Sequence, residues 1–194
     1  MERRRLVDPG ARPQQREDRE AALLARIARH DEAALMELYE AISPMVYACC
    51  LRILGDPDEA KDVTSQTFWR LWSRAGDYEP NLGSARAWIL TVGRRLALDQ
   101  RRRLLRRGHT LARLETRPLG GWDVWEQTAD RIHVSAALGR LSPGDRSLLE
   151  SVYFEGLSGS DIARRDHVPL GTVKSRMRAA LRHLRSALKG GWRR

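Results

Sequence analysis

The C-terminal part of the chain contains a strongly basic helical segment, which constrains the fold more than any other feature. Between residues 170 and 188 every Asp, Glu, Lys or Arg position is Lys or Arg, and apolar residues recur at helical spacing. A shorter capped segment, 156–165, precedes it, and residues 166–169 supply a tight turn. We therefore expect a helix, a turn and a basic helix, an arrangement that fits the major groove of DNA.

The charge of the chain indicates an acidic partner. Its 194 residues carry a formal net charge of +10, which suits one or two small domains that bind nucleic acid, although basic membrane-surface proteins share such a charge. Acidic residues dominate 31–62, whereas 94–107 and the C-terminus are basic. One part of the chain is therefore expected to avoid phosphate and two parts to attract it.

The chain shows no targeting or redox signature. No apolar run approaches the roughly 20 residues of a membrane span, and the N-terminus lacks the apolar core of a signal peptide, so we expect a cytoplasmic protein. Cys49 and Cys50 are adjacent and too few for a zinc cluster. Buried thiols in a helix are favoured over a redox sensor.

Caps and breakers divide the first half of the chain into helices. Residues 1–19 have little apolar content and are expected to form a solvated tail. Ser43-Pro44 is expected to cap and begin a helix that ends at Gly55. Asp56, followed by Pro57 and by Glu59 at the capping-box position, predicts another helix that runs to about residue 74.

The second half continues the helical pattern. Ser84 is expected to cap a helix that reaches Arg103, and Ser142 caps a further one. Residues 105–130 have no sustained period and are expected to form a linker. Because no alternating strand pattern appears between turns, the predicted fold class is all-α.

Two sets of motifs resemble one known family. The first set comprises Asp62-Val63, Thr67-Phe68, Leu71-Trp72, residues 83–91 and Ala97-Leu98-Asp99. The second comprises Leu141-Ser142-Pro143, residues 153–158, Ile162-Ala163 and residues 169–176. In this order and separation they resemble the second and fourth conserved regions of extracytoplasmic-function (ECF) sigma factors, members of the sigma-70 family.

The resemblance implies two small helical domains joined by a flexible linker. The expected parts are a disordered charged tail (1–19), sigma region 2 (20–104), a linker (105–130), sigma region 4 (131–189) and a basic tail (190–194). The implied partners are core RNA polymerase, promoter DNA and an anti-sigma factor that controls a stress-responsive activity. Trp122 and Trp125 of the linker would meet that inhibitor, follow the RNA path or pack on the second domain.

The resemblance also assigns contact residues in region 2. Core polymerase would meet the helix from Asp56 to Arg74, where the off-stripe Trp69 either meets the polymerase or packs within the chain. The loop 77–83 matches the loop that selects a base of the minus-ten element, and single-strand capture needs stacking surfaces and cations. Trp88 is more simply a core residue, and the arginines could merely form a solvated face. The expected polymerase contacts are Asp62, Gln66, Trp69 and Trp72, and the expected minus-ten contacts are Tyr78, Asn81, Trp88, Arg94, Arg95, Arg101 and Arg102.

In region 4 the helix from Leu170 would enter the major groove at the minus-thirty-five element. Its expected base-facing residues are Thr172, Lys174, Ser175 and Arg178, with Arg176 and Arg182 on the DNA backbone. Its expected packing residues are Val173, Met177, Ala180, Leu181 and Leu184.

Three positions depart from the family pattern. Asp166-His167 replaces an apolar residue and glycine in the turn, which removes a packing residue and calls for a left-handed histidine. Ser65-Gln66 replaces the usual glutamine and acid, and Arg94-Arg95 stands where many relatives carry an asparagine. Affinity for polymerase and base preference can therefore differ from those of relatives.

Two other classes of function were weighed. Residues 156–160 approach a nucleophile elbow, but Ser160 ends the motif and no strand precedes it; the histidines lack metal-ligand spacing, so we expect no enzyme, metal or cofactor. The runner-up is a helix-turn-helix regulator that binds operators unaided, with residues 20–103 as a sensor or dimerisation domain. A basic helix after a Tyr/Asn loop favours the sigma factor.

Overall fold

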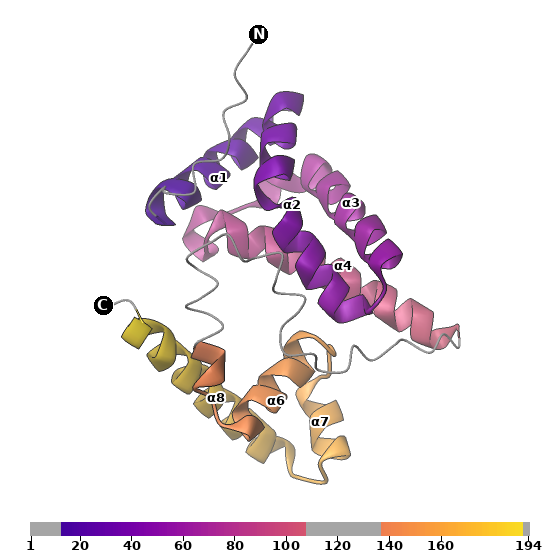
Figure 1. Cartoon of the computed structure of the whole chain (residues 1–194), viewed down its shortest axis with the longest axis vertical. Helices are drawn as coiled ribbons and strands as arrows, with labels where there is room; N and C mark the ends of the chain where they lie inside the picture. Colours follow the sequence, from indigo (N-terminus) through magenta and orange to yellow (C-terminus); the bar gives the residue numbers. More distant parts are fainter. Residues whose placement is uncertain (1–12, 108–136, 192–194) are drawn as a thin grey trace. The chain divides into compact units, whose positions relative to one another are not determined.

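A computed structural model describes residues 13–107 and 137–191 and divides the chain into two compact units, 1–127 and 128–194 (Figure 1). All regular elements in the described ranges are helical, which confirms the predicted fold class. The first unit contains α1 (Pro13–Ile27), α2 (Glu32–Leu54), α3 (Pro57–Arg74), the 3₁₀ turns η1 (Ala75–Asp77) and η2 (Pro80–Leu82), and α4 (Ala85–Arg106). The second contains α6 (Pro143–Tyr153), α7 (Gly159–Arg165) and α8 (Leu170–Gly191).

Several expectations lie outside the described residues. These are the first part of the N-terminal tail, the linker beyond residue 107 with Trp122 and Trp125, the start of the second domain near residue 131, and the end of the basic tail.

Side-chain caps begin the helices where the sequence predicts them. The Asp56 carboxylate accepts hydrogen bonds from the backbone N–H groups of Asp58 and Glu59, both at 2.9 Å. The Ser84 hydroxyl accepts one from Ala87 at 3.2 Å, and the Ser142 hydroxyl one from Asp145 at 3.1 Å. Each cap satisfies N–H groups that have no partner within the helix, which fixes the first turn.

The predicted helix start at Ser43-Pro44 is wrong, because α2 continues through Pro44. Its buried side chains include Leu38, Ile42, Val46 and Cys50, spaced four residues apart on both sides of the proline. A proline inside a helix costs about 3 kcal/mol. Burial of one continuous stripe against α3 and α4 offsets that cost, since each large apolar side chain contributes about 1.5–3 kcal/mol.

By length and composition alone, α2 is apolar enough to cross a membrane; it is the one such helix within the described ranges. Its stripe packs against α1, α3 and α4, and Leu38, Ile42 and Val46 are fully buried there. Core helices of folded domains have this composition as well, so the packing accounts for the apolar character of α2.

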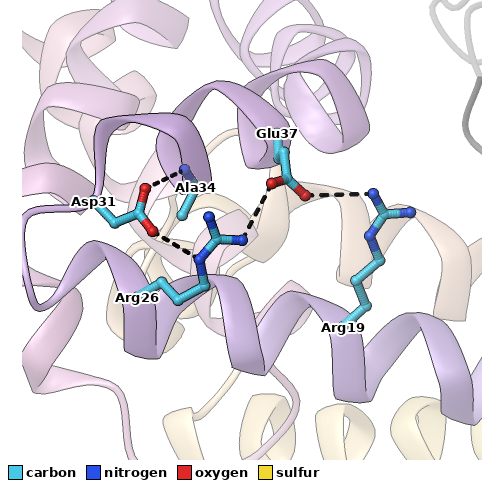
Figure 2. A network of polar contacts seen from close by, with 5 residues as sticks. All are labelled: Arg19, Arg26, Asp31, Ala34 and Glu37. Carbon is cyan, nitrogen blue, oxygen red and sulfur yellow. Dashed lines mark hydrogen bonds and ion pairs between the residues drawn. The ribbon is translucent and has the colours of Figure 1, made fainter. Parts of the chain in front are cut away.

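The first helix begins earlier than expected, since residues 13–19 of the predicted tail are helical. Ion pairs attach α1 to α2 (Figure 2). Arg26 contacts Asp31 at 2.8 Å and Glu37 at 3.1 Å, and Arg19 contacts Glu37 at 3.6 Å. Composition alone did not predict the start of α1, because Arg19 is held by Glu37 of the next helix, and such a contact between helices is not visible in the local sequence.

The second unit has a small core formed by Leu148 of α6, Ile162 of α7 and Val173 of α8. Half-buried apolar side chains surround it: Val152, Leu157, Ala163, Val168 and Met177. His183 of α8 also contacts Asp145 of α6, with 2.7 Å between Nδ1 and Oδ2. One side of α8 is thereby held, and the opposite side faces solvent.

Candidate nucleic-acid interface

Helix α8 exposes a basic face opposite its packed face. Val173 and Ala180 are buried, and Met177 and Leu184 are half-buried, as predicted from the spacing. Leu181, expected to pack, is 51% exposed because it lies about 100° around the helix from Ala180. The packing prediction is wrong for this residue only.

The expected DNA contacts of α8 fall into two groups. Ser175, Arg178 and Arg182 are exposed and lie opposite the apolar stripe, and the exposed Lys174 lies at one side of this group. Thr172 is half-buried and its carbonyl accepts a hydrogen bond from the Ser175 hydroxyl at 2.9 Å; it lies, with the exposed Arg176, toward the margin of that face. The helix brings four of the six residues onto one surface that a groove could receive.

A capped turn leads into this helix. The Ser158 hydroxyl and the Asp161 carboxylate form a capping box at the start of α7. His167 has φ 53°, so the left-handed histidine expected from the sequence is confirmed. The next residue, Val168, donates a backbone hydrogen bond to Ala163 at 3.1 Å and packs on the core.

Arg165 ties the turn to α6. Its guanidinium donates to Ser151 at 2.9 Å and to Asp166 at 2.7 Å, and it lies 3.5 Å from Glu155. The hydrogen bond from Arg165 lowers the pKa of the Asp166 carboxyl. The acid in the turn, which departs from the family pattern, is therefore paired and charged, and its ionic contacts stand where an apolar residue would pack.

In the first unit, the segment between α3 and α4 forms a closed loop. The Tyr78 hydroxyl donates to the Gly83 carbonyl at 3.2 Å, and its ring lies 5.7 Å from that of Trp88. Both aromatic side chains are half-buried, so Trp88 is not the fully buried core residue that the simpler interpretation expected. Asn81 is exposed, and Leu82 is 82% exposed.

Leu82 was missed by the sequence reasoning. Its position between Asn81 and Gly83 in a loop is the signal that could have found it, because a leucine there has no helix face to pack on. It follows Asn81 in an exposed stretch of the loop, residues 79–83.

The basic residues of α4 follow from the same helical geometry. Trp88, Arg95 and Arg102 recur every seven residues and share one side of the helix. Arg95 and Arg102 are exposed, and Arg102 contacts Asp99 at 3.0 Å. Arg94 and Arg101 are half-buried on the adjacent side. The loop therefore continues into a basic row along α4.

A third surface lies on α3. Asp62, Gln66 and Trp69 are exposed at i, i+4 and i+7, and Trp69 is 74% exposed. Trp72 departs from this group, since it is half-buried and its ring lies edge-on to His30 at 5.2 Å. An indole left open beside polar side chains is a typical anchor for a protein partner.

The cysteines do not resemble a reactive or metal-binding site. Burial raises the pKa of Cys49 to about 11 and that of Cys50 to about 12, so both thiols stay protonated at neutral pH. Within residues 13–107 and 137–191, no group of three or more His, Cys, Asp or Glu side chains could hold a metal ion.

Comparison with known proteins identifies the family. The model of sigma-70 region 2 matches residues 38–107, and that of sigma-70, region 4 matches residues 137–186. The ECF RNA polymerase sigma factor SigK of Mycobacterium tuberculosis (strain ATCC 25177 / H37Ra) is 34% identical over 174 residues, covering 86% of this chain and 92% of that protein. SigK of Mycobacterium sp. (strain KMS) is 31% identical over 176 residues, covering 86% and 89%.

A solved structure of Rhodobacter sphaeroides SigE in complex with the anti-sigma ChrR is similar as well. It is 27% identical, with a TM-score of 0.46, over 88% of this chain and 98% of that one. Two matched regions in the order expected from the sequence, together with relatives more than 30% identical along most of their length, show that the chain belongs to the ECF sigma factors of the sigma-70 family.

Proposed function

We propose that this sigma factor binds core RNA polymerase through α3 and directs it to promoters that it recognises through α4 and α8. The observation that carries the proposal is the presence of an exposed basic helix face in each of two units, one of them continuous with an exposed loop. A conventional operator-binding regulator would need only the face on α8.

At the minus-ten element, Asn81 and Leu82 face the displaced strand, and Tyr78 and Trp88 hold the loop that presents them. Arg95 and Arg102 follow the strand's phosphates, with Arg94 and Arg101 at the side of the same path. Unstacked bases need apolar or planar surfaces and a cationic track, and these residues provide both.

At the minus-thirty-five element, α8 enters the major groove. Lys174, Ser175 and Arg178 contact base edges from the first turns, and Thr172 contacts the groove wall. Arg176 and Arg182 bind phosphates. Base contacts set sequence preference, whereas phosphate contacts set affinity and its dependence on salt.

Core polymerase covers Trp69 together with Asp62 and Gln66, while Trp72 contacts the edge of that interface. The factor is not itself an enzyme, needs no cofactor, and acts in the cytoplasm with the polymerase. Region 2 occupies about residues 20–104 and region 4 about 131–189, joined by the linker 105–130 between an N-terminal tail (1–19) and a basic C-terminal tail (190–194). An anti-sigma factor holds the protein inactive until a stress signal releases it.

The direct test is transcription in vitro with core polymerase, with and without this protein, on a pool of genomic promoter fragments from its own organism. New start sites that appear only with the protein are the expected result, and their alignment gives both promoter elements. Tight operator binding by the protein alone, without new transcripts, would instead identify a conventional regulator.

A further inference from the structure

The loop between α3 and α4 is supported at both ends by α1. The turn η1, where the loop begins, and helix α4, where it ends, both contact α1. Helix α1 is thus the common support of both ends of the loop. It ends at Ile27, before the part of the chain matched to region 2, which begins at residue 38.

A buried ion pair makes the contact between α1 and α4. Arg86 Nε lies 3.0 Å from Oε1 and 3.2 Å from Oε2 of Glu20, and the Arg86 Nη2 atom contacts Oε1 as well. The side chain of Glu20 is 5% exposed and that of Arg86 is 24% exposed. When a guanidinium contacts one carboxylate through two nitrogens, the contact fixes the orientation of the arginine side chain as well as its position.

In sequence, Arg86 lies close to the residues that close the loop. Ser84, two residues before Arg86, caps α4, and Trp88, two residues after it, packs against Tyr78. Tyr78 in turn closes the loop through its bond to Gly83. The direction in which α4 leaves Arg86 therefore sets where Asn81 and Leu82 stand.

We propose that Glu20 is a positioning residue for minus-ten recognition: it orients the first turn of α4 through Arg86 and so holds the loop in the geometry that receives the displaced strand. The proposal rests on the function proposed above and extends the promoter-binding apparatus to α1, which contacts no DNA in this account. Buried ion pairs often contribute little net stability, so a role in geometry accounts better for a buried carboxylate at this position.

The test compares Glu20→Gln with Glu37→Gln in the full-length protein assembled with core polymerase. Glu37 is a matched control, because it also pairs with arginines of α1, Arg19 and Arg26, but it attaches α1 to α2 (Figure 2). The readout is the ratio of transcripts from a matched promoter to those from one with a substituted minus-ten base. The same ratio is measured for a substituted minus-thirty-five base.

We expect Glu20→Gln to lower the minus-ten ratio about tenfold, since one well-placed base contact discriminates by about that factor. The minus-thirty-five ratio is expected to stay unchanged, and Glu37→Gln to leave both ratios unchanged. Arg86→Lys, which keeps the charge but loses the two-nitrogen contact, is expected to lower the minus-ten ratio to an intermediate value.

A ratio does not depend on how much of the protein is folded, so a destabilised variant still gives a result. The proposal is overturned if Glu20→Gln lowers total transcription but leaves the minus-ten ratio as in wild type, or if both ratios fall together. Failure of the wild-type protein to direct any new transcript would instead reject the proposed function, before any variant is compared.

Discussion

Helices α4 and α8 both carry rows of arginines, but they are held in different ways. Helix α4 packs against α1, α2 and α3 and buries residues along its whole length, among them Ile89, Gly93 and Leu104. Helix α8 makes its main contacts with α6 and α7, and among its described side chains Val173 and Ala180 are buried. Helix α4 is therefore part of the core of its unit, whereas α8 packs with one side on the small core of the other unit.

This difference in packing determines whether DNA-contacting residues can be substituted without a change in stability. On α8 the side chains of Lys174, Ser175 and Arg178 are exposed, so sequence preference can vary there without loss of the fold. On α4 the residues of the loop and the basic row share turns with core residues, so recognition there depends on packing as well. Substitutions should therefore separate recognition from stability on α8 and couple them on α4.

The largest effect is expected from Lys174→Ala combined with Arg178→Ala. Each removes a proposed base contact, and each such contact discriminates by roughly tenfold or more, so preference for the minus-thirty-five sequence should fall about a hundredfold. Both side chains are exposed, so the free energy of unfolding should change by no more than about 1 kcal/mol, about 0.5 kcal/mol for each surface position. Competition binding against substituted elements, with thermal unfolding, measures both.

Arg182→Ala is the control for that variant. As a proposed phosphate contact, it should weaken binding to all sequences alike and reduce the slope of log affinity against log salt by about one. A selective loss for one sequence would assign Arg182 to the bases.

Trp69→Ala should weaken binding to core polymerase at least tenfold, because a buried tryptophan at an interface typically contributes about 2 kcal/mol or more. Stability should not change, since Trp69 is 74% exposed in the free chain. Equilibrium binding to core polymerase tests this, with Leu181→Ala, an exposed apolar residue of the other unit, as control. Equal loss in both variants would contradict a polymerase site on α3.

Two glycines sharpen the contrast between the units. A Cβ at Gly93 would lie 3.1 Å from Val46 Cγ1 and 3.3 Å from Thr67 Oγ1, two buried β-branched side chains on different helices. Overpacking of this kind costs about 1–3 kcal/mol, so Gly93→Ala should lower the free energy of unfolding despite a better helix propensity.

At Gly159 the added Cβ would meet the end of the Leu170 side chain, at 3.2 Å. That side chain is 39% exposed and can move, so Gly159→Ala should be neutral within about 0.5 kcal/mol. Denaturant unfolding of both variants tests the pair. A larger loss at Gly159 than at Gly93 would contradict the packing difference.

A separate prediction concerns the thiols of Cys49, which is half-buried, and Cys50, which is buried. With a pKa of about 11, about one Cys49 thiol in a thousand is ionised at pH 8, against about one in ten for an ordinary thiol with a pKa of 9.0. Cys49 in the folded protein should therefore react with a thiol reagent about a hundredfold more slowly than in the unfolded chain. Labelling as rapid as in denaturant would refute this burial.

The same raised pKa values give a pH dependence. The thiols contribute their full stability below pH 9, the ordinary thiol pKa, and this contribution declines as pH rises toward about 11, because the unfolded chain ionises first. Unfolding measured from pH 8 to 10.5 should show this decline, and a Cys49→Ser, Cys50→Ser variant should show less of it.

Capping residues in the sequence predicted most helix starts correctly. The features that the sequence did not predict depend on contacts between distant residues. Asp56, Ser84, Ser142 and Ser158 cap helices because each cap needs only its own next three residues. The break at Pro44 was wrong because a continuous buried stripe outweighs a local propensity.

For the site, helical spacing in the sequence predicted which faces of α3, α4 and α8 are exposed. It did not predict which side chains of different elements contact one another. The tilted ring contact of Tyr78 with Trp88 and the pair of Glu20 with Arg86, separated by 66 residues, depend on how the helices pack. The side chains that touch across a fold cannot be inferred from a local pattern.

The central claim is that each unit recognises its own promoter element. It is tested most directly by measuring the affinity of holoenzyme for two half-promoters: a duplex with only the minus-thirty-five element, and a fork with a single-stranded minus-ten element. Lys174→Ala with Arg178→Ala should lose affinity for the first and keep it for the second, and Arg95→Ala with Arg102→Ala should do the reverse. Equal losses on both DNAs from either pair would contradict separate recognition by the two helices.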